Sequence, residues 1–181
     1  MEYWDVYDRD RTKTGKKVKR GNKSYGNSNL LGSEYHLVVH ICIFNSNNQM
    51  LIQKRQSSKE TLANLWDISA AGSALFGETS YEAAQREVSE ELGYAIDLSG
   101  KREHLSINFD RGFDDFYLIN EDIDLDSLTL QKEEVQAVKW AKEEDILKLI
   151  DEGEFVPYYK DLIRLLFSMK DRPLGSHSKN I

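Results

Sequence analysis

Polar and apolar residues alternate with the period of β-strands in several short runs. The segments YHLVVHICIFN (35–45) and QMLIQKRQ (49–56) flank the polar stretch SNNQ, and the first is rich in β-branched residues. This pattern is typical of a strand, a turn and a second strand. Four further runs predict extended segments: LWDISAAGSAL (65–75), HLSINFD (104–110), DDFYLIN (114–120) and VQAVKWA (135–141).

Three other segments follow the helical period. In residues 79–93 Thr79 and Glu82 form a capping-box pattern at the start, and Gly93 stands where a helix commonly ends. Residues 142–153 and 158–169 carry apolar positions at helical spacing and predict two terminal helices. Strands mixed with helices in this order predict an α/β (α+β) layer sandwich. The apolar stripe of the first helix consists of Tyr81, Ala84, Val88 and Leu92.

Both ends of the chain differ from this core. YWDVYDRDRTKTGKKVKR (3–20) reads as a small hairpin, and residues 21–33 are rich in Gly, Asn and Ser. The last residues, DRPLGSHSKNI, have no apolar period. We therefore expect a hairpin and loop extension at 1–33, one domain at 34–170 and a flexible tail at 171–181.

Composition narrows the classes of function. The net charge of −7 gives no broad attraction to nucleic acid or to an anionic membrane, so we expect neither a stable nucleic-acid complex nor a membrane partner. Cys42 is the single cysteine, which excludes an intramolecular disulfide and favours a cytoplasmic protein. The N-terminus lacks the features of a signal peptide. The sequence leaves both a monomer and a homodimer as alternatives.

Three glutamates crowd the predicted helix at 79–93. Glu87, Glu90 and Glu91 stand at i, i+3 and i+4, so their side chains are neighbours on the helix surface. Like charges at this spacing destabilise a helix when nothing offsets them. Two interpretations follow: a solvated acidic face, or a site for Mg²⁺ or Mn²⁺, which prefer oxygen ligands.

A wider spacing favours the cation. Glu78 follows Gly72 after five residues, and after seven more comes Arg-Glu-Val-Ser-Glu-Glu-Leu-Gly, residues 86–93. This resembles the signature box of the Nudix hydrolases, and we call residues 72–94 the box. Its fixed residue types would match by chance on the order of once in a million chains of this length. Only Tyr94 departs, at a packing position where an aliphatic residue is usual.

The resemblance implies both a fold and a reaction. The fold would be a Nudix-type α/β/α sandwich with a mixed β-sheet between helices. The reaction would be metal-dependent hydrolysis of the diphosphate (P–O–P) linkage of a nucleoside diphosphate-type small molecule, with Mg²⁺ or Mn²⁺ as cofactor. The implied metal ligands are Glu87, Glu90, Glu91 and the main-chain carbonyl of Ala71. Glu90 would be either a further ligand or the base that activates water.

The other box residues would support these ligands. Arg86 would orient Glu87 and Glu90 through fork-like hydrogen bonds. Its alternative is a surface ion pair with Glu82, four residues earlier. The positions that would shape the loop and the helix are Gly72, Glu78 and Gly93.

Residues outside the box could contact the substrate. Lys54 and Arg55 stand where the family often places a cation near the phosphates, although a solvated strand end is the equal alternative. Trp66 is a candidate either for stacking or for the core. Glu134, beside Glu133, lies in a segment from which some family members recruit a general base, and a plain charged loop is its alternative.

A nearer subgroup is suggested by the flanking sequence. YWDVYDRDRTKTG and EYHLVVHICIFN resemble the Nudix subgroup related to isopentenyl-diphosphate isomerase. However, Ala71 stands where the isomerase has its catalytic cysteine, and Ser73 and Asn29 replace two metal-binding histidines. Only His36 matches. The box is complete here and degraded in isomerases, so a hydrolase is favoured over an isomerase-like enzyme and over a non-catalytic Nudix-fold nucleotide sensor.

Two histidines and the cysteine of the 35–45 strand have structural interpretations. His36 and His40 are four residues apart and point to one face of the strand, where we expect core or hydrogen-bonded rings. Cys42 is expected to be a buried, inert thiol.

Overall fold

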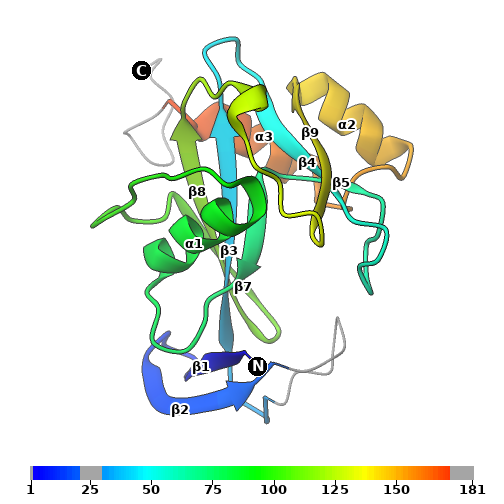
Figure 1. The fold of residues 1–181 in the computed structure, drawn as a ribbon. Coiled ribbons are helices and arrows are strands. Elements are labelled where there is room, and N and C mark those ends of the chain that lie inside the picture. The colour runs from blue at the N-terminus through cyan, green and yellow to red at the C-terminus, as the bar shows by residue number, and fades with distance from the viewer. Residues whose placement is uncertain (1, 21–29, 172–181) are drawn as a thin grey trace, which may run out of the picture.

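A seven-stranded mixed sheet forms the centre of the computed structural model, which describes residues 2–20 and 30–171. β3 and β8 run parallel through its middle, and the other pairs are antiparallel (Figure 1). The strands are β3 (His36–Phe44), β4 (Met50–Arg55), β5 (Trp66–Asp67), β6 (Ala70–Ser73), β7 (Leu105–Phe109), β8 (Gly112–Asn120) and β9 (Val135–Ala141).

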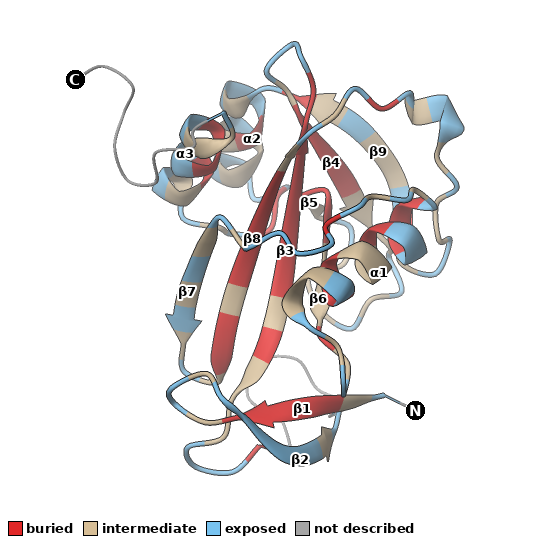
Figure 2. Ribbon diagram, turned by 90° about the vertical axis from the view of Figure 1, so that its left-hand side faces the viewer, coloured by how far each residue is buried: buried red, intermediate tan, exposed pale blue. Residues whose placement is uncertain are grey.

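Helices cover both faces of the sheet. α1 (Ser80–Leu92) packs on one face, where Val39, Ile41 and Ile43 of β3 point, while α2 (Glu143–Asp151) and α3 (Lys160–Met169) pack on the other. The strand period of two explains how β3 serves both cores, and it is buried along most of its length (Figure 2). The expectation of a mixed sheet between helices in an α+β fold is confirmed.

β3 changes its partner on one side along its length. Residues 38–41 pair with β6, whereas Phe44 pairs with Met50 of β4. β4 turns away to pair with β9 and β5, so the sheet opens between β4 and β6. At the opening, the Gln53 side chain of β4 and the Ala71 amide of β6 reach Glu91 in the C-terminal half of α1, and these groups belong to the site described below.

The segment LWDISAAGSAL forms two short strands, β5 and β6. Ser69 interrupts them, because its hydroxyl donates to the carbonyl of Leu51 at 2.6 Å and accepts from the amide of Ile43 at 2.8 Å. A buried side chain thus takes the place of ladder hydrogen bonds. The expected tail lies beyond residue 171, outside the described residues.

The N-terminal hairpin predicted from residues 3–20 is β1 (Tyr3–Tyr7) paired antiparallel with β2 (Lys13–Lys19). It docks on the start of β3: Tyr7 and Tyr35 exchange two backbone hydrogen bonds of 2.8 and 3.0 Å, and the Trp4 ring stacks on His36 at 4.3 Å. Within the described ranges, no helix is long and apolar enough to cross a bilayer.

His36 makes the fold sensitive to acid. Its ring lies between Trp4 and Phe109, and burial lowers its pKa to about 4 although the charge of Asp114 opposes this. An unfolded histidine titrates near pH 6.5. Between these values the unfolded chain binds a proton that the folded one excludes, so stability falls as the pH falls.

We predict that His36→Phe, which keeps an aromatic ring against Trp4, loses less stability than the wild type between pH 7 and pH 4.5. The difference should be about 2 kcal/mol, measured by urea unfolding at both pH values. Equal losses of stability for the two proteins would show that His36 is protonated in the folded protein as readily as in the unfolded chain.

Candidate active site

α1 is fixed at both ends by its own sequence. Thr79 caps the first turn, and Glu82 bonds back to the Thr79 amide at 2.8 Å, as the capping-box pattern predicts. Gly93 ends the helix in the left-handed conformation with φ of 63°, where a side chain would collide with Thr129. These ends set the rotation of the helix, which turns Ala84 and Val88 into the core and carries Glu87 and Glu91 toward the sheet opening.

Glu91 is buried, with 7% of its surface exposed. Its Oε2 accepts from Gln53 Nε2 of β4 at 2.8 Å and from the amide of Ala71 of β6 at 3.4 Å. Burial first, and then the charge of Glu87, raise the pKa of Glu91 to about 8. A wet acidic face is therefore the wrong interpretation for this residue.

Glu87 lies against the β6 backbone. A Cβ added to Gly72 would fall 2.0 Å from Glu87 Oε1, so only glycine allows this close approach. The Glu87 side chain is 12% exposed, and burial raises its pKa against the opposing charge of Arg86. The box glycine and its first glutamate thus form one packed unit.

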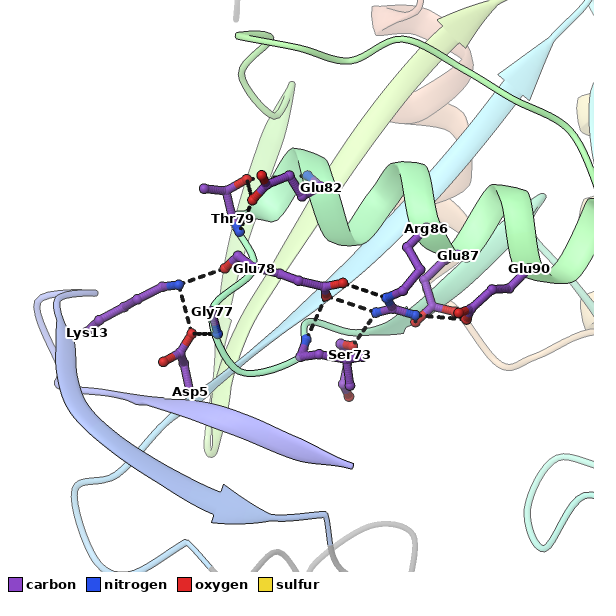
Figure 3. A network of polar contacts seen from close by, with 11 residues as sticks. Asp5, Lys13, Ser73, Gly77, Glu78, Thr79, Glu82, Arg86, Glu87 and Glu90 are labelled. Carbon is purple, nitrogen blue, oxygen red and sulfur yellow. Dashed lines mark hydrogen bonds and ion pairs between the residues drawn. The ribbon is translucent and has the colours of Figure 1, made fainter. Parts of the chain in front are cut away.

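Arg86 holds the box together (Figure 3). Its Nε donates to Glu78 Oε1 at 2.7 Å, and its Nη2 donates to Glu78 Oε2 and to the carbonyl of Ser73, both at 3.1 Å. Its Nη1 bridges Glu87 Oε1 at 2.9 Å and Glu90 Oε2 at 3.0 Å. The alternative ion pair between Arg86 and Glu82 is wrong, because the Glu82 carboxylate is bonded to Thr79 instead.

Glu90 differs from the other two glutamates. Its side chain is 52% exposed and is held by Arg86 across one helical turn. A single arginine therefore ties a buried carboxylate to a solvent-facing one. Of the three, Glu90 has the access to water that a base would need.

The donor set suits a divalent cation. Glu87 Oε2 and Glu91 Oε1 accept no hydrogen bond from any described residue, and Gln53 Oε1 is buried without a partner among them. Burial raises the pKa of both carboxylates, and the positive charge of a hard cation beside them would favour their ionised forms. In residues 2–20 and 30–171 no three His, Cys, Asp or Glu side chains already form a metal cage; Arg86 and Gln53 hold the carboxylates instead.

A loop brings Glu134 to the same end of α1. The amides of Thr129 and Gln131 donate to the carbonyls of Leu92 and Glu91 at 3.0 Å, which anchors residues 129–135 on the helix. Glu134 forms an ion pair with Lys59, a lysine of the 56–65 loop. Glu133 beside it is exposed.

Lys59 is the cation that the sequence did not single out. Burial lowers its pKa, and the charges of Glu91 and Glu87 act on it in the opposite direction. Lys59 thus lies close enough to Glu91 and Glu87 for their charges to act on it, while its ion pair is with Glu134. Neither Lys59 nor Gln53 lies in the box or in a recognisable motif, so only the tertiary pairing of loops and strands reveals them.

The three residues proposed for substrate contact lie on β4 and β5. Arg55 donates to Asp67 Oδ2 at 3.2 Å and to the carbonyls of Leu62 and Thr61, which commits its guanidinium to the chain. Two lysine ammonium groups lie over the Trp66 ring, with Lys139 Nζ at 4.3 Å and Lys54 Nζ at 5.8 Å from its centroid. Trp66 and Lys54 are partly exposed, so a ligand can reach them.

The opposite face of the sheet holds the second histidine. His40 Nε2 lies 3.0 Å from Asp114 Oδ1, and its ring stacks on Phe116. Cys42 is fully buried, and burial raises the pKa of its thiol. The expectations of hydrogen-bonded or core histidines and of a buried cysteine are confirmed.

Comparison with known proteins agrees with this geometry. A sequence model of the NUDIX domain matches residues 34–165. An uncharacterised Nudix hydrolase of Listeria monocytogenes is 50% identical over 171 residues, which cover 94% of this chain and 96% of the relative. A crystal structure from Deinococcus radiodurans has a TM-score of 0.70 at 26% identity and covers 91% of this chain and 97% of its own.

Similarity to an isomerase is shorter. An isopentenyl-diphosphate Delta-isomerase of Serratia proteamaculans is 40% identical over 63 residues, 35% of either chain. The likeness to the Listeria hydrolase spans nearly the whole chain, whereas the likeness to this isomerase spans about a third of it.

We predict that Glu91→Gln stabilises the metal-free protein at pH 8.5. A glutamate whose folded pKa is raised contributes stability below its unfolded pKa near 4.3 and loses it as the pH rises through about 8. The variant should melt at least about 3 °C above the wild type in chelator at pH 8.5, with a smaller gap at pH 5, by differential scanning calorimetry.

Adding Mg²⁺ or Mn²⁺ should then raise the melting temperature of the wild type more than that of Glu91→Gln, because the neutral amide binds the ion more weakly than the carboxylate does. A lower melting temperature for the variant than for the wild type in chelator at pH 8.5 would contradict this prediction, because the ionised Glu91 side chain would then stabilise the fold.

Proposed function

The chain belongs to the NUDIX domain family and is a Nudix hydrolase, and from that premise we propose that it hydrolyses the diphosphate linkage of a nucleoside diphosphate-type small molecule with Mg²⁺ or Mn²⁺. One observation carries the proposal. Glu91 is buried and the Glu87 side chain is only 12% exposed at the sheet opening, and each has one oxygen that no described residue bonds. Placing two poorly solvated carboxylates side by side costs free energy of folding, and a bound cation would offset that cost.

Glu87, Glu91 and the carbonyl of Ala71 would hold the ion, with Glu90 as a further ligand or the base. When bound, the ion supplies neutralisation of the diphosphate charge and activation of water. Arg86 fixes the direction of Glu87 and Glu90, which keeps their oxygens in place before substrate arrives. Glu134 is the alternative base, since its loop is anchored to the helix at Glu91.

We assign the phosphate contact to Lys59 in preference to Arg55. The charges of Glu91 and Glu87 act on Lys59, which has an ion pair with Glu134, whereas the guanidinium of Arg55 is committed to three groups of the chain. Lys54 and Trp66 would contact the rest of the substrate, with the indole available to stack on a base.

No observation favours the isomerase alternative. Ala71 and Ser73 cannot perform the proton transfer and metal binding of the residues they replace. His36, the one matching histidine, is enclosed by Trp4 and Phe109.

The substrate class is tested by a screen of nucleoside diphosphates, dinucleotides, nucleotide sugars and isoprenoid diphosphates with Mg²⁺ or Mn²⁺. Release of phosphate or pyrophosphate from a nucleotide compound supports the proposal. Hydrogen exchange into isopentenyl diphosphate in deuterated water, with no phosphate released, would establish the isomerase instead. Tight nucleotide binding without turnover would establish a sensor.

The roles of the glutamates are separated by single substitutions. Glu91→Gln and Glu90→Gln should each lower kcat at least about 100-fold if the first binds metal and the second activates water. Glu134→Gln tests the other base, and Glu133→Gln, an exposed neighbour in the same loop, is its matched control. Full activity in both Glu90→Gln and Glu91→Gln would remove the catalytic assignment.

A further inference from the structure

The N-terminal hairpin contacts the box at Gly77 and Glu78, in the loop that precedes α1. We propose that Lys13 and Asp5 of this hairpin are positioning residues for the carboxylates of the box. The inference rests on the proposed metal-dependent function, and it gives the hairpin a part in the site. The chain of contacts can be followed from hairpin to helix in Figure 3.

Two side chains of the hairpin bond to the backbone of the box loop. Asp5 is buried, and its Oδ2 accepts from the Gly77 amide at 2.8 Å and from Lys13 Nζ at 2.7 Å. Lys13 Nζ also donates to the carbonyl of Glu78 at 2.7 Å. Gly77 has φ of 94°, so the loop takes a turn that only glycine adopts readily, and the hairpin holds it there.

Glu78 connects the hairpin to Arg86 and to the carboxylates that Arg86 holds. Its carbonyl is bound by Lys13, while its carboxylate accepts from Arg86 at 2.7 and 3.1 Å. Arg86 in turn bridges Glu87 and Glu90. A displacement of the Glu78 backbone would therefore move the arginine and, with it, both carboxylates.

A second tie fixes the start of α1. Arg11, in the turn of the hairpin, forms an ion pair with Asp115 of β8. Asp115 is fully buried and accepts from the hydroxyl of Ser80, the first residue of α1, at 2.5 Å. The hairpin is thus bonded to the loop before the helix and, through one carboxylate, to the first turn of the helix.

The hairpin can act as a fixed support because it is itself anchored. Its Tyr7 pairs with Tyr35 at the start of β3, and Trp4 stacks on His36. The contacts to Gly77 and Glu78 use a buried carboxylate and an ammonium group, so they are stronger than neutral hydrogen bonds. Loss of the Lys13 charge leaves Asp5 buried beside an unsupported loop.

The test compares Lys13→Met with Lys16→Met, a control on the same strand whose lysine pairs with Glu34 instead of the box. Mn²⁺ binding without substrate is followed by electron paramagnetic resonance at 10 °C. Lys13→Met should weaken binding roughly 5-fold, while Lys16→Met and the rescue variant Lys13→Arg stay within about 2-fold of the wild type. Melting curves show that each variant is folded.

Steady-state kinetics with the best substrate of the screen give the second readout. Lys13→Met should lower kcat and raise the half-saturating metal concentration, with the substrate KM changed less than about 2-fold. Asp5→Asn, which keeps an acceptor for Gly77 and removes the charge beside Lys13, should act in the same direction more weakly.

The outcomes separate the two proposals. Normal Mn²⁺ binding and kinetics in folded Lys13→Met would overturn the positioning role, whatever the substrate is. Failure of both Lys13→Met and Asp5→Asn to fold would overturn it too, because the hairpin would then serve the fold alone. A wild type that binds Mn²⁺ but hydrolyses no diphosphate would defeat the proposed function, while the Mn²⁺ comparison still decides the role of Lys13.

Discussion

Two carboxylates of one helix lie beside each other at the opening of the sheet, where Glu91 is buried and the Glu87 side chain is only 12% exposed. Burial raises the pKa of both, so the fold bears the cost of acidic groups that are poorly solvated. Neutral partners such as Gln53 offset only part of that cost. Arg86 offsets a further part through its bond to Glu87, and a divalent cation would offset the rest.

The fold places the charge where a ligand can reach it. β3 passes from β6 to β4 as its neighbour, and the opening between these strands receives the Glu91 side chain from α1. Arg86 then links a buried glutamate to an exposed one, so one side of the cluster meets protein and the other meets solvent. Lys59 and Glu134 close the site from two loops that are bonded to each other.

The sequence was informative wherever the signal was local. Thr79, Glu82 and Gly93 predicted the ends of α1 because capping depends on neighbouring residues. The resemblance of the box implied Glu87 and Glu90 as partners of Arg86, but not its bonds to Glu78 and to the carbonyl of Ser73. Gln53, Lys59 and the contacts of Lys13 could not be predicted, because each depends on segments between 38 and 75 residues apart meeting in space. The partners of Arg55 lie only 6 to 12 residues away, but they depend on the path of the loop between β4 and β5, which no local pattern specifies.

Crystals soaked in Mn²⁺ and measured at the manganese absorption edge test the central claim most directly. The account predicts an anomalous peak bounded by the carboxylates of Glu87 and Glu91 and the carbonyl of Ala71, with Arg86 still bonded to Glu78. Diffraction that shows Glu91 unchanged against Gln53, and no peak near either glutamate at millimolar Mn²⁺, would contradict it.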